Sequence, residues 1–152
     1  MLLKFWQRRW RNRTEARLDR RTIGVRCAAN PLSLCFHIPF TLASIDASRR
    51  PPLRTNQPRG SHNFDDFTFE GEVLVGRVLE QSGVVEVDVR PRYFWVRVSR
   101  TDDWPGLLPI IIQLIRLRLG DQRYPLRIKP AFNPRVPSWH APLMRELFDH
   151  LS

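Results

Sequence analysis

The net positive charge of this chain lies entirely in its first part. Residues 1–62 carry 13 Lys and Arg against 3 Asp and Glu, whereas residues 63–152 carry 12 of each. Such an asymmetry predicts a basic arm attached to a folded body, with the arm as the place where a polyanion binds. We therefore divide the chain into a basic N-terminal arm, residues 1–62, and a body, residues 63–152.

The composition is that of a globular protein. The chain has 152 residues, of which 42% are hydrophobic and 26% charged, enough to bury a core without disulfides or metals. Its basic residues are 23 Arg and 2 Lys. The planar guanidinium fork suits phosphate, although GC-rich coding accounts for the same Arg excess.

Residues 2–21 predict a basic amphipathic helix that stops near Gly24. Leu3, Trp6 and Trp10 follow helical spacing, and arginines cover most of the remaining surface. Arginine clusters bind phosphates by releasing counterions, and tryptophan stacks on unpaired bases. The candidate nucleic-acid-binding residues are Arg8, Arg9, Arg11, Arg13, Arg17, Arg20, Arg21, Trp6 and Trp10.

Three other interpretations of the arm stay open. Basic residues opposite Trp and Phe also suit an anionic membrane surface. An amphipathic, Arg-rich N-terminus is typical of an organelle transit peptide, although Glu15 and Asp19 count against this. The helix can also simply pack its apolar side on the body. We favour nucleic acid, with RNA slightly ahead of DNA.

Apolar and polar residues alternate over residues 32–42, which predicts a half-buried strand within the arm region. Pro39 lacks a backbone N–H, so the strand is expected at a sheet edge or bent at that residue. Residues 48–62 are polar and rich in Pro and Arg, as in a linker.

The body is predicted to be α+β, with a small antiparallel β-meander packed on one apolar helix. Strands are expected over residues 69–79, 84–90 and 93–99, joined by connections too short for parallel pairing. A helix is favoured at 105–119, although residues 115–119 also alternate as a strand does. A strand at 124–129 and a short helix over about 141–151 complete the body.

The third strand predicts a second candidate binding surface. Tyr93, Trp95 and Arg97 share its polar side, where aromatic side chains on an open sheet stack on RNA bases. The same residues are equally explained by a face that another segment or a protein partner covers.

Two sets of residues are candidates for a catalytic site or a metal site. Glu70, Glu72, Glu86 and Asp88 would gather carboxylates on one sheet face, as a metal-dependent nuclease needs, but cross-strand ion pairs explain them equally well. The spacing of Cys27, Cys35, His37 and His62 is unlike that of known zinc sites. We expect no metal, no cofactor and no catalytic residue.

One short segment resembles a known pattern. Leu108-Pro109-Ile110-Ile111-Ile112, followed by Pro125, resembles the minimal F-box-like motif of plant-virus silencing suppressors, which implies a host-factor partner. Core packing of a Leu-Pro-initiated helix accounts for the same residues.

The sequence therefore predicts a non-enzymatic nucleic-acid-binding accessory protein that acts through its Arg/Trp-rich arm. The alternative is a protein-interaction adaptor, such as a viral accessory protein, whose partner site is the Trp95 face or the Leu107–Leu119 segment and whose arm directs localisation. Neither a secretory signal nor a transmembrane segment is evident. We expect an intracellular protein of the nucleus or cytoplasm, with organelle import as the alternative.

Overall fold

The computed structural model describes residues 23–27, 30–44, 51–58, 63–120 and 126–129. These residues form a six-stranded sheet with two α-helices. The predicted helices at 2–21 and 141–151 lie outside the described residues, as do the candidate residues of the arm.

The sheet has the strand order β3-β4-β5-β2-β1-β6. Its first five strands, in that order, are antiparallel neighbours, and β6 pairs parallel to β1 at the edge. The strands are β1 (Ile23–Cys27), β2 (Ser33–His37), β3 (Leu53–Arg54), β4 (Val84–Val89), β5 (Tyr93–Val98) and β6 (Leu126–Lys129). Strands from both sides of the predicted boundary at residue 62 thus share one sheet.

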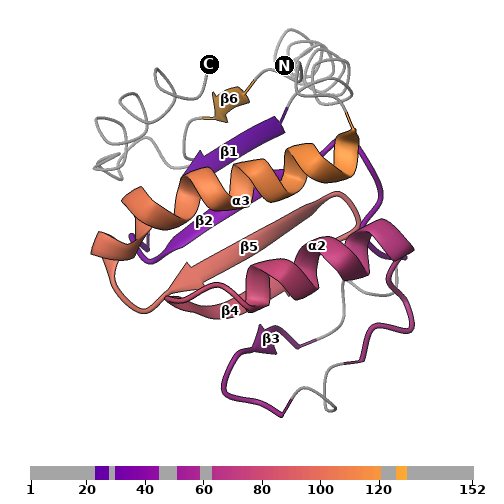
Figure 1. Ribbon diagram of the computed structural model, residues 1–152, viewed down its shortest axis with the longest axis horizontal. Helices are drawn as coiled ribbons and strands as arrows, with labels where there is room; N and C mark the ends of the chain where they lie inside the picture. The colour runs from indigo at the N-terminus through magenta and orange to yellow at the C-terminus, as the bar shows by residue number, and fades with distance from the viewer. Residues whose placement is uncertain (1–22, 28–29, 45–50, 59–62, 121–125, 130–152) are drawn as a thin grey trace, which may run out of the picture.

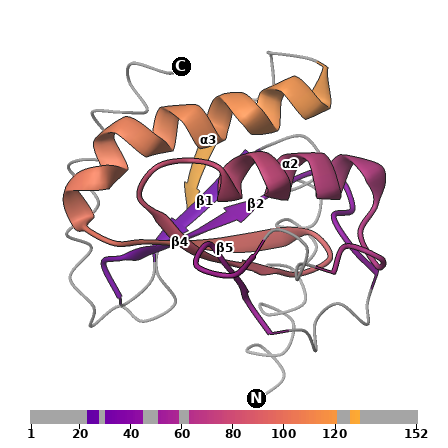
Figure 2. The ribbon, with the colours of Figure 1, turned by 60° about the horizontal axis from the view of Figure 1, so that its bottom comes forward.

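The two helices, α2 (Phe69–Leu79) and α3 (Trp104–Leu119), lie side by side on one face of this sheet (Figures 1 and 2). Their inner sides and the inward side chains of the strands form one hydrophobic core, centred on Phe36, Phe94, Leu74 and Ile111. Phe36 and Phe94 stack with ring centroids 5.3 Å apart. The α+β class and the antiparallel β4–β5 pair are confirmed.

The predicted strand at residues 69–79 is wrong, because this segment is the helix α2. Its buried residues, Gly71, Leu74, Val75 and Val78, recur at helical spacing. Thr68 caps the helix, since its hydroxyl accepts a hydrogen bond from the Gly71 backbone N–H at 3.0 Å. The layer on the sheet therefore consists of two helices rather than one.

The segment at residues 32–42 is also corrected. It forms the shorter strand β2, which ends at His37 before Pro39. β2 lies in the interior of the sheet between β5 and β1, not at an edge. The proline is accommodated because it follows the strand, so no ladder hydrogen bond is lost.

The helix favoured at residues 105–119 is confirmed as α3, and the alternative strand at 115–119 is wrong. Pro105 stands in its first turn, where an N–H has no intrahelical partner. Gly120 ends it with a left-handed φ of 66°, and its N–H bonds to the Arg116 carbonyl. The strand expected at 124–129 is confirmed as β6, residues 126–129.

Candidate nucleic-acid interface

The sheet has an outward face, opposite the helix layer, that carries the predicted surface of Tyr93, Trp95 and Arg97. Side chains alternate along β5, so Phe94, Val96 and Val98 enter the core while these three point away from it. Both α-helices of the described chain lie on the other side of the sheet (Figure 2).

Strand register determines which residues join them. Trp95 pairs with Cys35 of β2 and with Asp88 of β4, and Cys35 pairs in turn with Arg26 of β1. Tyr93 pairs with His37, and Arg97 pairs with Ser33 and Glu86. Because paired residues share a sheet face, β1, β2 and β4 all contribute to this surface. We call Arg26, Cys35, His37, Tyr93, Trp95 and Arg97 the outward cluster.

Two aromatic contacts organise the outward cluster. The rings of His37 and Tyr93 stack with centroids 5.1 Å apart and an interplanar angle of 25°. The guanidinium carbon of Arg26 lies 5.3 Å from the centroid of the Trp95 ring, within the range of a cation–π interaction. Arg26 Nη2 also approaches the Cys35 sulfur at 3.7 Å. Neighbouring strands therefore hold both outward aromatic rings of β5.

Ion pairs occupy the β4 side of the outward face. Glu86 accepts from Arg97 at 2.7 Å and lies 3.9 Å from Arg54 of β3. Asp88 pairs with Arg90 at 3.3 Å. Among the residues just named, four Arg, including Arg26, stand against two carboxylates, which is a positive balance.

The predicted carboxylate cluster does not form. Glu86 and Asp88 lie on the outward sheet face, whereas Glu70 and Glu72 belong to α2 on the other side of the sheet. Within the described part of the chain, no group of His, Cys, Asp or Glu side chains is placed to hold a metal ion. The nuclease hypothesis loses its geometric basis at this set of residues.

Burial raises the pKa of Asp88 above its ordinary value of 3.8. The neighbouring Arg90 acts in the opposite direction through its charge and its hydrogen bond, and Glu86 adds a smaller raising effect. The folded chain thus binds a proton at Asp88 more readily than the unfolded chain does.

This shift predicts a pH effect on stability. Because the folded-state pKa is the higher one, protonation of Asp88 stabilises the fold as the pH falls through that value. In urea unfolding, the wild type should gain stability relative to the Asp88→Asn variant as the pH falls from neutral toward the ordinary aspartate pKa of 3.8. A stability difference that stays constant, or a wild type that loses stability relative to Asp88→Asn as the pH falls, would contradict the assigned burial of this carboxyl.

Comparisons with family models, curated proteins and solved structures found no match to this chain. A function for the outward cluster therefore has to be inferred from the geometry of the cluster itself. No helix in the described ranges has the length and hydrophobicity needed to cross a membrane.

The sequence predicted the β5 part of the outward cluster and missed the role of β1. Arg26 was not singled out because β1 is a strand of only five residues, and its alternation of Ile23 and Val25 with Gly24 and Arg26 is too short to stand out. The shared face of Cys35 and His37 was visible in the sequence, but only the register of β2 on β5 connects these residues to the aromatic rings.

The segment at residues 107–119 has one buried side and one side that faces away from the core. Leu108, Ile111 and Ile112 of the motif are buried, while Ile110 is exposed. Core packing therefore accounts for three of the four aliphatic residues in the F-box-like pattern.

Proposed function

We propose that this protein binds single-stranded nucleic acid without catalysing a reaction, using its N-terminal arm together with the outward cluster. The observation that supports this most directly is the placement of Trp95 and Tyr93, with Arg26 and Arg97 beside them, on the sheet face away from the helices. Aromatic rings on a sheet face bind bases by stacking, and guanidinium groups bind the phosphates between them. Tyr93, Trp95 and Arg97 are half-buried, and the neighbouring Cys35 is buried.

The first 21 residues of the arm, which hold its seven candidate arginines, are joined along the chain to the outward cluster. β1 begins at Ile23, two residues after Arg21, and contributes Arg26 to the cluster. A nucleic-acid strand that stacks on Trp95 therefore lies close to β1, the strand that follows these 21 residues in the chain. The arm supplies sequence-independent affinity for phosphates, and the cluster adds contacts that require unpaired bases. We place RNA ahead of DNA.

Single strands are favoured over duplex by the nature of the cluster. Tyr93 and Trp95 are two residues apart on one strand, which places their side chains about 7 Å from each other. That distance suits successive unstacked bases. A duplex keeps its bases stacked and presents its grooves and phosphates to a protein instead.

The proposal is tested by the affinity of the full-length chain for a labelled single-stranded RNA of about ten nucleotides, measured by fluorescence anisotropy over a range of salt. Trp95→Ala should weaken binding about 5- to 150-fold, the loss expected for one stacked base, with little change in salt dependence. Phe69→Ala is the matched control, because it removes an exposed aromatic side chain from the helix layer.

A second variant separates the arm from the cluster. Replacing all seven candidate arginines of the arm with Gln should flatten the slope of log affinity against log salt by up to about 5. Equal losses for Trp95→Ala and Phe69→Ala would reject the outward cluster as the binding surface. A slope unchanged by the arginine replacements would reject the arm.

A further inference from the structure

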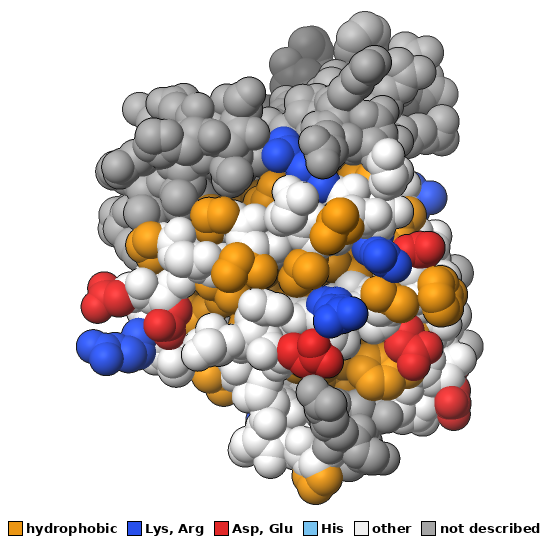
Figure 3. All heavy atoms as spheres, viewed as in Figure 1, with side chains coloured by type: hydrophobic (Ala, Val, Ile, Leu, Met, Phe, Trp, Pro, Cys, Tyr) orange, Lys and Arg blue, Asp and Glu red, His pale blue; other side chains and the backbone are white. Residues whose placement is uncertain are grey.

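The helix layer carries exposed apolar side chains that the proposed nucleic-acid binding does not use. Phe69 of α2 is 73% exposed, and Ile110 and Leu117 of α3 are 43% and 56% exposed. Ile110 and Leu117 lie seven residues apart, on the same side of α3. Figure 3 shows hydrophobic side chains spread across this face of the molecule.

The two helices are antiparallel, so the layer has two different ends. Arg118, near the end of α3, pairs at 3.5 Å with Glu70, near the start of α2. Phe69 and Leu117 therefore share one end, where large apolar side chains project. Gly76 of α2 and Gly106 of α3 lie toward the other end, and a Cβ added at either glycine would meet nothing within 4 Å. We call the end with Phe69 and Leu117 the raised end, and the end with Gly76 and Gly106 the open end.

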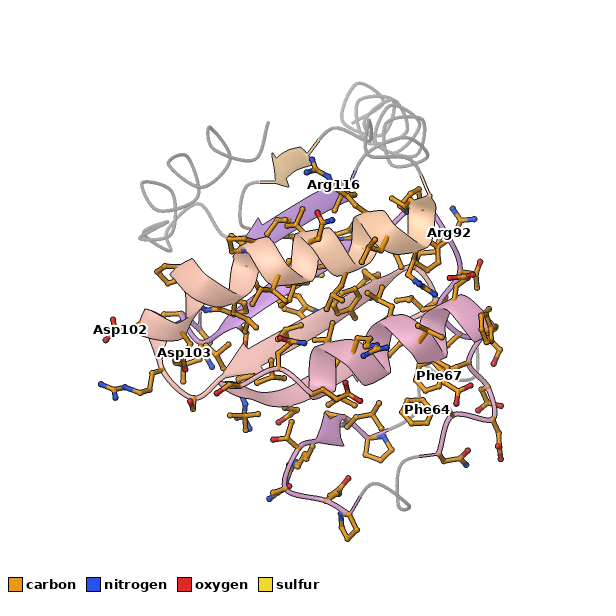
Figure 4. The ribbon with its side chains drawn as sticks, in the orientation of Figure 1. Phe64, Phe67, Arg92, Asp102, Asp103 and Arg116 are labelled. Atoms are coloured by element: carbon orange, nitrogen blue, oxygen red, sulfur yellow. The ribbon has the colours of Figure 1, made fainter. Side chains whose placement is uncertain are left out.

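The charges of the layer also differ from those of the chain as a whole. The two helices and Glu80, the C-terminal cap of α2, contain three Arg and three Glu, whereas the whole chain has a net charge of +10. α2 starts with Glu70 and Glu72 and has Arg77 in its last turn. α3 follows Asp102 and Asp103 and ends with Arg116 and Arg118. Asp102 and Asp103 lie at the start of α3, and Arg116 lies near its other end (Figure 4).

We propose that the helix layer binds the helix layer of a second copy of this chain. The two copies are related by a twofold axis that lies in the plane of contact, perpendicular to the two helices. This symmetry places the raised end of one copy on the open end of the other and vice versa. It also brings the basic last turns of one copy's helices toward the N-terminal ends of its partner's helices, with helix dipoles antiparallel. Glu70 and Glu72 lie in the first turn of α2, and Asp102 and Asp103 precede α3. Charge complementarity thus accompanies the fit of large side chains over glycines.

The same arrangement reduces repulsion between two basic chains. Contact through the helix layers joins the neutral sides, while the two outward sheet faces point away from each other. A dimer of this kind would present two outward clusters on opposite sides. Apolar burial drives the contact, so it persists at high salt, where polyanion binding is lost.

The experiment is sedimentation equilibrium of the full-length chain, freed of nucleic acid, at high salt. The wild type should show a concentration-dependent monomer–dimer equilibrium. Leu117→Glu should weaken dimerisation by about tenfold or more, because each copy would have to bury a charge against apolar surface. Asn56→Glu, an equal charge change at an exposed residue that follows β3, should leave dimerisation unchanged.

A second variant tests the fit of the two ends. Gly76→Leu improves helix propensity and adds apolar surface, yet it fills the open end and should weaken dimerisation. Wild-type chain that stays monomeric at all concentrations would overturn the proposal, as would equal effects of Leu117→Glu and Asn56→Glu. Dimerisation unchanged or strengthened by Gly76→Leu would overturn the twofold arrangement. Because RNA is absent, these results do not depend on the proposed function.

Discussion

Replacing Gly71 with alanine should destabilise the fold by about 3 kcal/mol or more. A Cβ at this residue would overlap the backbone of Leu42, whose Cα would be 2.8 Å away. The contact cannot open easily, because the Leu42 carbonyl accepts hydrogen bonds from the backbone N–H and the hydroxyl of Thr68. The added methyl group must therefore displace the first turn of α2 from the segment that follows β2.

The matched control is Gly76→Ala in the same helix. A Cβ at Gly76 meets no neighbour, so the substitution should be neutral or should stabilise α2 by up to about 1 kcal/mol through helix propensity. Both variants are compared with wild type by urea unfolding. If the two alanines have the same effect on the free energy of unfolding, the close approach of α2 to Leu42 is incorrect.

Trp104→Ala should cost about 3–5 kcal/mol, the range for truncation of a fully buried aromatic side chain. The Trp104 ring is 0% exposed at the start of α3. Its indole N–H donates to the Pro31 carbonyl at 3.1 Å, which ties the helix to the turn before β2. The substitution therefore opens a cavity and leaves that carbonyl without its indole donor.

Trp104→Phe separates these two contributions. Phenylalanine restores most of the buried apolar surface but cannot donate to Pro31, so it should recover more than half of the lost stability and not all of it. Full recovery would show that the hydrogen bond adds nothing. A negligible effect of Trp104→Ala would contradict the placement of this ring in the core.

The sequence predicted those elements whose residue pattern fits mainly one kind of secondary structure. β4 alternates from Val85 to Val89 and β5 over all six of its residues, and α3 has sixteen residues with Pro105 and Gly120 at its ends. α2 was misassigned because Val73, Val75 and Val78 are β-branched residues, which are typical of strands. The Thr68 cap and the packing of α2 on Leu42 favour the helix. The contact with Leu42 joins segments far apart in the sequence, so local periodicity does not show it.

The site was predictable only within one strand. Tyr93, Trp95 and Arg97 follow from alternation in β5, but pairing of β2 with β5 and of β1 with β2 is a long-range property of the fold. A β-bulge between Val84 and Glu86 adds a local exception. It lets Val84 and Val87, three residues apart, both face the core, where strict alternation would place Val85 instead of Val84.

The most direct test of the outward cluster as the binding surface is amide chemical-shift mapping of the full-length chain during titration with the single-stranded RNA. The account predicts shifts that concentrate on the outward residues of β1, β2 and β5, centred on Arg26 and Trp95, with little change at Ile110 and Gln113 of α3. Shifts confined to the helix layer, or to residues 1–21 with the sheet unaffected, would contradict it.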